Sequence, residues 1–113
     1  MSVVSTQAAA NTTAIVVKAT PGLLYGIAAW NNSSTIYYGK IYDAASGTCG
    51  SGTPKDRFMI PAASTGGAGF VFAVGPIGVT YATGIVLCIT AGYADSDTTN
   101  PTVSTAQVSV FFN

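Results

Sequence analysis

The chain has 113 residues, four basic and four acidic side chains, a formal net charge of zero, and neither histidine nor glutamate. This length fits one domain with its own core, and the lack of histidine excludes Ser-His-Asp and Cys-His catalysis. Only 7% of the residues are charged, against about 25% in ordinary soluble domains. So few charged residues indicate that much of the protein surface is buried against partners in an assembly. The alternative is a secreted domain wetted by Ser, Thr and Asn side chains.

Residues 1–12 carry little apolar weight and predict a flexible arm before a single domain at residues 13–113. The domain alternates short runs of β-branched and aromatic residues with turns of Gly, Pro, Asn and Ser. The runs that predict strands are residues 13–19, 23–30, 35–42, 58–61, 70–74, 81–91 and 103–112. No segment combines a 3.6-residue period with helix caps. We therefore expect an all-β fold of about seven or eight strands, an antiparallel β-sandwich (jelly-roll or immunoglobulin-like) or a small barrel.

Three features of this strand and turn pattern lead to further predictions. Ile85–Ile89 is apolar on both faces, which predicts a central strand of the sandwich or a strand under an interface. The irregular alternation of residues 35–42 predicts a β-bulge at Gly39. The polar segment at residues 43–57 is the longest predicted connection. Loops of this length are often functional, and the alternative is a slack surface loop.

The two cysteines, Cys49 and Cys88, lie in a glycine-rich turn and in the apolar strand, respectively. Two cysteines allow one bridge, but spacing alone does not show that they meet. Synthesis in the cytoplasm disfavours a disulfide. We therefore interpret Cys88 as a small buried apolar residue and Cys49 as a free thiol in a loop.

The acidic residues form no convincing catalytic or metal site. A glycosidase pair would have to come from Asp43, Asp56, Asp95 and Asp97, which lie mostly in loops or at strand ends. The segment at residues 95–100 begins like a calcium loop, but Asn100 and Ala106 stand where glycine and glutamate are needed. We predict no enzymatic activity, no catalytic residues, no metal and no cofactor.

The aromatic residues admit two interpretations, as core or rim residues of the sandwich, which is the commoner case, or as an interface. Aromatic side chains on a β surface form protein interfaces or sugar platforms, although they also fill sandwich cores. The candidate interface residues are Trp30, Tyr37, Tyr38, Tyr42 and Phe111.

Nucleic acids and membranes are not expected partners. The basic residues Lys18, Lys40, Lys55 and Arg57 are too scattered to follow a phosphate backbone. No apolar run approaches the ~20 residues of a membrane span. The first seven residues lack the basic and apolar regions of a secretory signal, which predicts synthesis in the cytoplasm unless a signal has been removed.

Short motifs follow one another in a distinctive order along residues 13–112. They are Gly22-Leu23-Leu24-Tyr25-Gly26, Asn31-Asn32, Tyr38-Gly39-Lys40-Ile41-Tyr42-Asp43, Gly52-Thr53-Pro54, Ile60-Pro61-Ala62, Gly84-Ile85, Cys88-Ile89-Thr90 and Ala94-Asp95-Ser96-Asp97-Thr98-Thr99. This order resembles small virion proteins of tailed bacteriophages and prophages, in particular capsid decoration (cement) proteins. The resemblance lies in the succession of strand-like and turn-like segments, and no functional residues can be transferred from the family to this chain.

The resemblance implies a β-sandwich subunit on the capsid surface of the virion. Its partners would be the major capsid protein and copies of itself, as a homotrimer at a symmetry axis. Two alternatives remain: a tail, neck or fibre-attachment subunit, and a free-standing module that binds glycans or proteins. Low charge and cytoplasmic synthesis agree with assembly on a particle.

Overall fold

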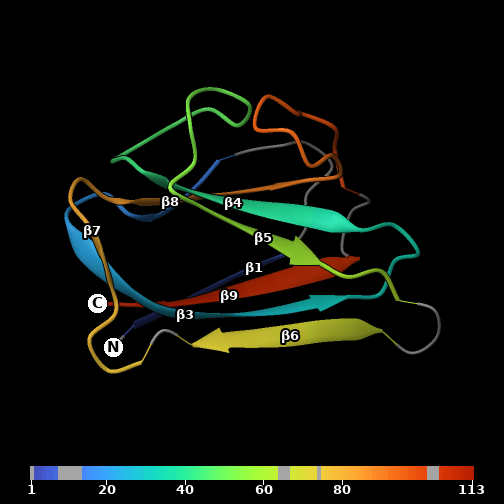
Figure 1. Cartoon of the computed structure of the whole chain (residues 1–113), viewed down its shortest axis with the longest axis horizontal. Coiled ribbons are helices and arrows are strands. Elements are labelled where there is room, and N and C mark those ends of the chain that lie inside the picture. Colours follow the sequence, from blue (N-terminus) through green and yellow to red (C-terminus); the bar gives the residue numbers. More distant parts are fainter. Residues whose placement is uncertain (1, 8–13, 64–66, 74, 102–104) are drawn as a thin grey trace.

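The computed structural model describes residues 2–7, 14–63, 67–73, 75–101 and 105–113. They form an all-β domain of two antiparallel sheets packed as a sandwich, which confirms the predicted fold class (Figure 1). The strands are β1 (Ser2–Gln7), β2 (Ile15–Lys18), β3 (Gly22–Asn31), β4 (Tyr37–Asp43), β5 (Asp56–Ile60), β6 (Ala68–Ala73), β7 (Val79–Tyr81), β8 (Ile85–Thr90) and β9 (Ala106–Phe112). No helix long and apolar enough to span a bilayer occurs in these residues.

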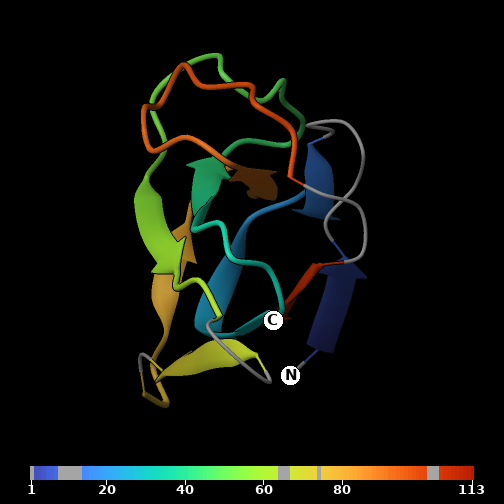
Figure 2. The same cartoon turned by 90° about the vertical axis from the view of Figure 1, so that its right-hand side faces the viewer.

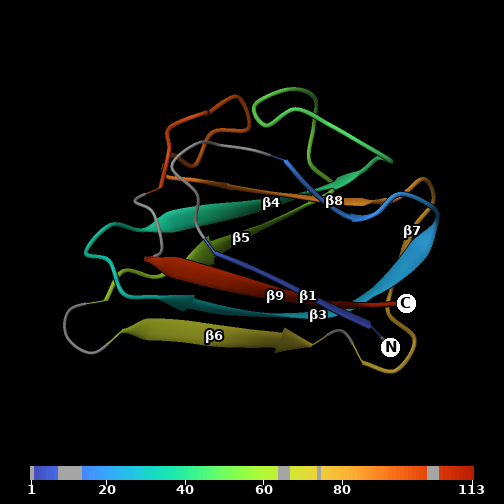
Figure 3. The same ribbon diagram turned by 180° about the vertical axis from the view of Figure 1, so that it is seen from behind.

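Sheet A has the order β1-β9-β3-β6, and β7 pairs with the first residues of β3. Sheet B has the order β2-β8-β4-β5. Seen from behind, β1, β9, β3 and β6 lie side by side along one layer of the sandwich (Figure 3). The chain therefore crosses between the layers several times, and residues distant in sequence become neighbours in each sheet.

The core lies between the sheets because each strand turns alternate apolar side chains inward. From sheet A these include Leu24, Ile27, Val108 and Val110, all at most 2% exposed. Every residue of β8 is buried, as the apolar run at residues 85–89 predicted for a central strand. β8 lies between β2 and β4, and its outer face is covered by loops, so both of its faces exclude water.

Two strands were not foreseen. Residues 1–12 were predicted to be a flexible arm, but Ser2–Gln7 pairs with β9 along its whole length. Residues 8–12 lie outside the part of the chain that is described. A weakly apolar segment can form an edge strand because backbone hydrogen bonds to a buried neighbour supply the pairing. β7 was not recognised as a separate strand, because Val79 was assigned to a turn and Tyr81 to the predicted strand at residues 81–91, and three residues are too few for a visible alternation.

The predicted bulge at Gly39 is wrong. Gly39 pairs in regular register with Phe58 of β5 and Ile89 of β8. The position is glycine for a packing reason, because a Cβ atom there would lie 2.0 Å from the ring of Phe58. The ring of Phe58 thus lies over the bare backbone of β4, and this irregularity in the sequence pattern marks a close contact between neighbouring strands.

Substitution of Gly39 by alanine is therefore expected to lower the free energy of unfolding by about 1–3 kcal/mol, because the Phe58 ring must leave its place. Gly47→Ala is the matched control, since the nearest atom to a Cβ there is 3.8 Å away. Urea unfolding of both variants measures the difference. Equal effects at the two positions would contradict this account of Gly39.

Candidate interaction surface

The charged side chains are confined to one layer of the sandwich. β1, β3, β6, β7 and β9, which make up sheet A, contain no charged residue. All eight charges lie in sheet B or in the loops that follow its strands: Lys18, Lys40, Asp43, Lys55, Asp56, Arg57, Asp95 and Asp97. The two outer faces of the molecule therefore differ sharply in chemistry.

The outer face of sheet B is covered by two loops of the chain itself, residues 44–55 and 91–101 (Figure 2). A disulfide joins Cys49 in the first loop to Cys88 in β8. Both cysteines are buried and pack with Tyr42 and Val86 in a small second core. The interpretation of Cys49 as a free thiol is therefore wrong, because the loop folds back over the strand that carries Cys88.

A buried lysine holds the second loop. The Lys40 side chain points outward from β4 but is only 1% exposed. Its Nζ donates hydrogen bonds to Thr90 Oγ1 at 2.8 Å, to the Gly92 carbonyl at 3.3 Å and to the Ala94 carbonyl at 2.5 Å. Burial lowers the pKa of Lys40, and the carboxylates of Asp97 and Asp95 partly oppose this shift. The ammonium group thus fastens the start of the loop onto sheet B.

Each of the four aspartates is occupied by a structural contact. The Asp95 carboxylate accepts two hydrogen bonds from Arg57, at 2.7 and 2.6 Å. Asp97 accepts from the backbone N–H groups of Gly92 and Thr99, and Asp56 accepts from the Tyr81 hydroxyl. The Asp43 carboxylate accepts from the backbone N–H groups of residues 82–84, and these bonds lower its pKa.

The resemblance of residues 95–100 to the start of a calcium loop therefore has a structural explanation. Asp95 and Asp97 point to different partners, and Asp97 closes its own loop. Within the described ranges, no three residues of the metal-binding types come together. The carboxylates stabilise turns in this part of the chain.

No described segment covers the outer face of sheet A, which presents small, apolar and uncharged polar side chains. Trp30 of β3 is 44% exposed, and Val71 of β6 is 79% exposed. A shallow depression of about 350 Å³ lies between them, over Ala28, Gly69 and Ser109, among other residues. Phe111 lies further along the same face, opposite Val3 of β1. We call this surface, formed by β1, β9, β3 and β6, the outer face of sheet A.

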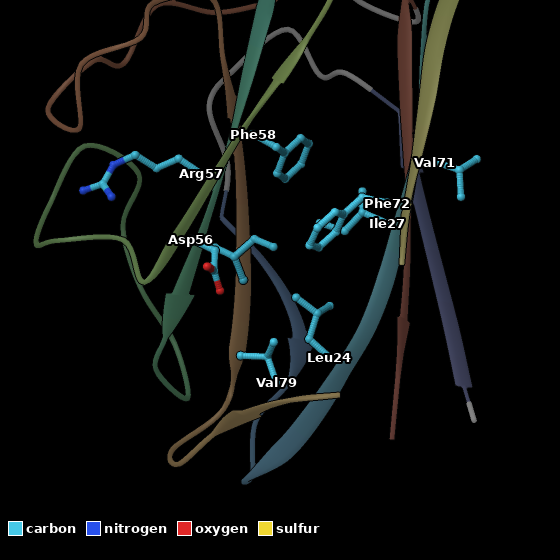
Figure 4. Close-up of a pocket in the computed structure, with 9 residues that line it drawn as sticks. Leu24, Ile27, Asp56, Arg57, Phe58, Val71, Phe72 and Val79 are labelled. Atoms are coloured by element: carbon cyan, nitrogen blue, oxygen red, sulfur yellow. The ribbon is translucent and has the colours of Figure 1, made fainter. Parts of the chain in front are cut away.

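A second apolar feature is a cleft between the edges of the two sheets, beside β5 and β6 (Figure 4). Its volume is about 270 Å³. Phe72 and Ile27 point into it from sheet A, facing Phe58 of β5, whereas Val71 points away from it. β5 and β6 are both edge strands, so no further described strand of either sheet closes the cleft on that side.

The structure separates the five predicted interface residues. Tyr37 and Tyr42 are 1% and 8% exposed, so they belong to the core and cannot form an outer interface. Tyr38 lies on the sheet B side, where its ring meets that of Tyr93 edge-on. The remaining two, Trp30 and Phe111, share the outer face of sheet A through the pairing of β3 with β9.

The exposed residues of β6 were missed as interface candidates. Val71 and Phe72 were assigned to a strand. Val71 is exposed because the outer face of sheet A is uncovered, and Phe72 is exposed because β6 lies at the edge of its sheet. Sequence alternation shows which residues share a face, but it does not show which strand lies at an edge. The sequence does offer one signal that could have pointed to an interface here: residues 58–94 contain no charged side chain.

Comparisons with family models, curated proteins and solved structures found no match to this chain.

Proposed function

We propose that this chain is a structural virion protein of a tailed bacteriophage, a capsid decoration protein that binds the outer surface of the head. The observation that carries the proposal is the outer face of sheet A, which has no charge and is covered by no described segment. Exposed apolar surface of this kind marks a site of association. The proposed role is mechanical and involves no catalysis.

The two faces of the sandwich would then have different tasks. Small residues such as Ala28 and Gly69 let a partner surface approach the sheet closely, while Trp30 supplies a large apolar contact. Sheet B carries its own cover of loops and all the charges, which suits a surface that faces water. Many weak contacts of this type give tight binding when copies act together on one particle.

The proposal is tested by adding the protein to heads that lack it, prepared from the phage or prophage that encodes the chain. Gln107→Lys places a charge on the outer face of sheet A beside Trp30 and is expected to weaken binding at least ~10-fold, since burial of an unpaired charge is costly. Thr53→Lys is the control, on an exposed position in the loop over sheet B. Co-sedimentation with heads measures both.

Three outcomes would contradict the proposal. Wild-type protein that does not bind heads excludes the decoration role. A greater loss with Thr53→Lys than with Gln107→Lys reverses the assigned orientation. Binding confined to tails or necks, seen by electron microscopy, selects the alternative virion role.

A glycan-binding module is the second candidate, and one observation favours it. The exposed Trp30 ring lies next to the polar side chains of Gln107 and Ser109 around the shallow depression. An aromatic ring beside hydrogen-bonding groups suits a sugar ring. Binding to a glycan panel that Trp30→Ala abolishes, together with no binding to heads, would select this function.

A further inference from the structure

The edge of sheet A at β6 lacks the features that normally prevent strands from associating. β6 pairs with β3 alone among the described strands, so the backbone groups on its other side point away from the sheet. Its six residues, Ala68–Ala73, include no charge and no proline, and its pairing with β3 shows no register shift. Such an edge is a template for another strand.

The edges of sheet B are protected by comparison. β2 has four residues, ends with Lys18 and shows an irregular register between Val16 and Lys18. β5 begins with Asp56 and Arg57. Charges, short length and irregularities at an edge all oppose pairing with a second chain. β1, the other edge of sheet A, is equally free of charge, proline and register shifts. The feature that distinguishes the β6 edge from β1 is the cleft next to it.

The apolar cleft lies directly beside this edge. Phe72 of β6 points into the cleft, yet it remains 47% exposed. Leu24 and Ile27 at its floor are core residues, each 2% exposed. The core is thus incompletely closed where β6 ends sheet A, and a strand added there would place alternate side chains over the opening.

We propose that two copies of this chain associate through β6, so that sheet A continues antiparallel from one copy into the other across a two-fold axis. A second copy fits this edge because the chain has zero net charge and no charge between residues 58 and 94. Two such edges meet without like-charge repulsion, and a two-fold contact uses the same patch on both copies. It also closes both clefts at once, which a head-to-tail contact with β1 would not do.

The pairing register is restricted. An axis perpendicular to the sheet keeps outward residues opposite outward residues. Val71 lies near the middle of β6 and points outward. It would therefore face Val71 of the second copy, or lie diagonal to it, at about 4.5–8 Å between Cβ atoms. One substitution at this position thus acts twice in the dimer.

Charge substitutions at Val71 test this contact in solution, without heads, by sedimentation equilibrium over a range of concentrations. Val71→Lys and Val71→Glu are each expected to raise the dissociation constant of the dimer at least ~10-fold, because like charges face each other across the axis. An equimolar mixture of the two variants is expected to regain association. Val16→Lys on β2, a site 47% exposed in the wild type, is the control and should dimerise normally.

The remaining outcomes overturn the proposal. Wild-type protein that stays monomeric at every concentration excludes the contact. A trimer without a dimer, which the resemblance to decoration proteins predicted, excludes a two-fold contact as the primary one. Weakening by Val3→Lys but not by Val71→Lys points to β1, and failure of the mixture to associate excludes the axis near Val71. Head binding is measured separately, so the two proposals can fail independently.

Discussion

A chain with both cysteines replaced by serine is expected to lose about 3–4 kcal/mol of unfolding free energy. The disulfide joins residues separated by 39 positions, and removing it frees that loop in the unfolded chain. For a domain of this size the loss corresponds to a fall in melting temperature of roughly 15 °C. Calorimetry of the Cys49→Ser, Cys88→Ser double variant measures it.

The same change also tests the cover on sheet B. Tyr42 and Val86 are buried under the loop that Cys49 anchors, so hydrogen exchange in residues 44–55 should increase in the double variant. Reduction of the wild type with a thiol should reproduce both effects, which separates loss of the bond from the cost of burying serine. An unchanged melting temperature after reduction would show that packing alone holds the loop.

The second large effect is expected at Lys40. Replacement by methionine keeps the length of the side chain but removes the donor for Thr90 Oγ1 and for the carbonyls of Gly92 and Ala94. We expect a loss of about 2–3 kcal/mol in unfolding free energy, because buried acceptors lose a charged partner. Residues 91–101 should exchange their amide hydrogens faster than in the wild type.

Lys18→Met is the control, at a lysine outside the loop contacts, and should change stability by less than ~0.5 kcal/mol. A pH series adds an independent readout. Because burial lowers the pKa of Lys40 below its value in the unfolded chain, the unfolded state binds more protons between those two values, and stability relative to Lys40→Met should rise with pH there. A Lys40→Met variant as stable as the wild type would show that the Arg57–Asp95 pair suffices to hold the loop.

The fold class was predictable because strand alternation and turn residues are local properties. The run at residues 85–89 is apolar on both faces, and it predicted the buried strand β8. β1 was not predictable, because its pairing depends on β9 at the other end of the chain. The disulfide was missed for the same reason, since only the fold of the loop brings Cys49 to Cys88.

The candidate surface was predicted in part. Aromatic content pointed to Trp30 and Phe111, which share the outer face of sheet A, but equally to Tyr37 and Tyr42, which fill cores. Sequence does not separate these cases, because the exposure of a strand residue depends on what covers its face. The burial of Lys40 could not be predicted for the same reason. A lysine in a strand normally predicts exposure to solvent, and its acceptors here come from Thr90 at the end of β8 and from the carbonyls of Gly92 and Ala94 in the loop above it.

The register of β1 against β9 has a mechanical consequence. Ser2 lies opposite Phe112, so the first and last described residues leave sheet A at the same end of the β1–β9 strand pair. A force that pulls these ends apart loads one hydrogen-bonded pair at a time and peels β1 from β9. A force applied along the strands would load all the pairs together. The β1–β9 pair is therefore expected to separate first when the chain ends are pulled apart. In sheet B, by contrast, the disulfide links β8 covalently to the loop above it.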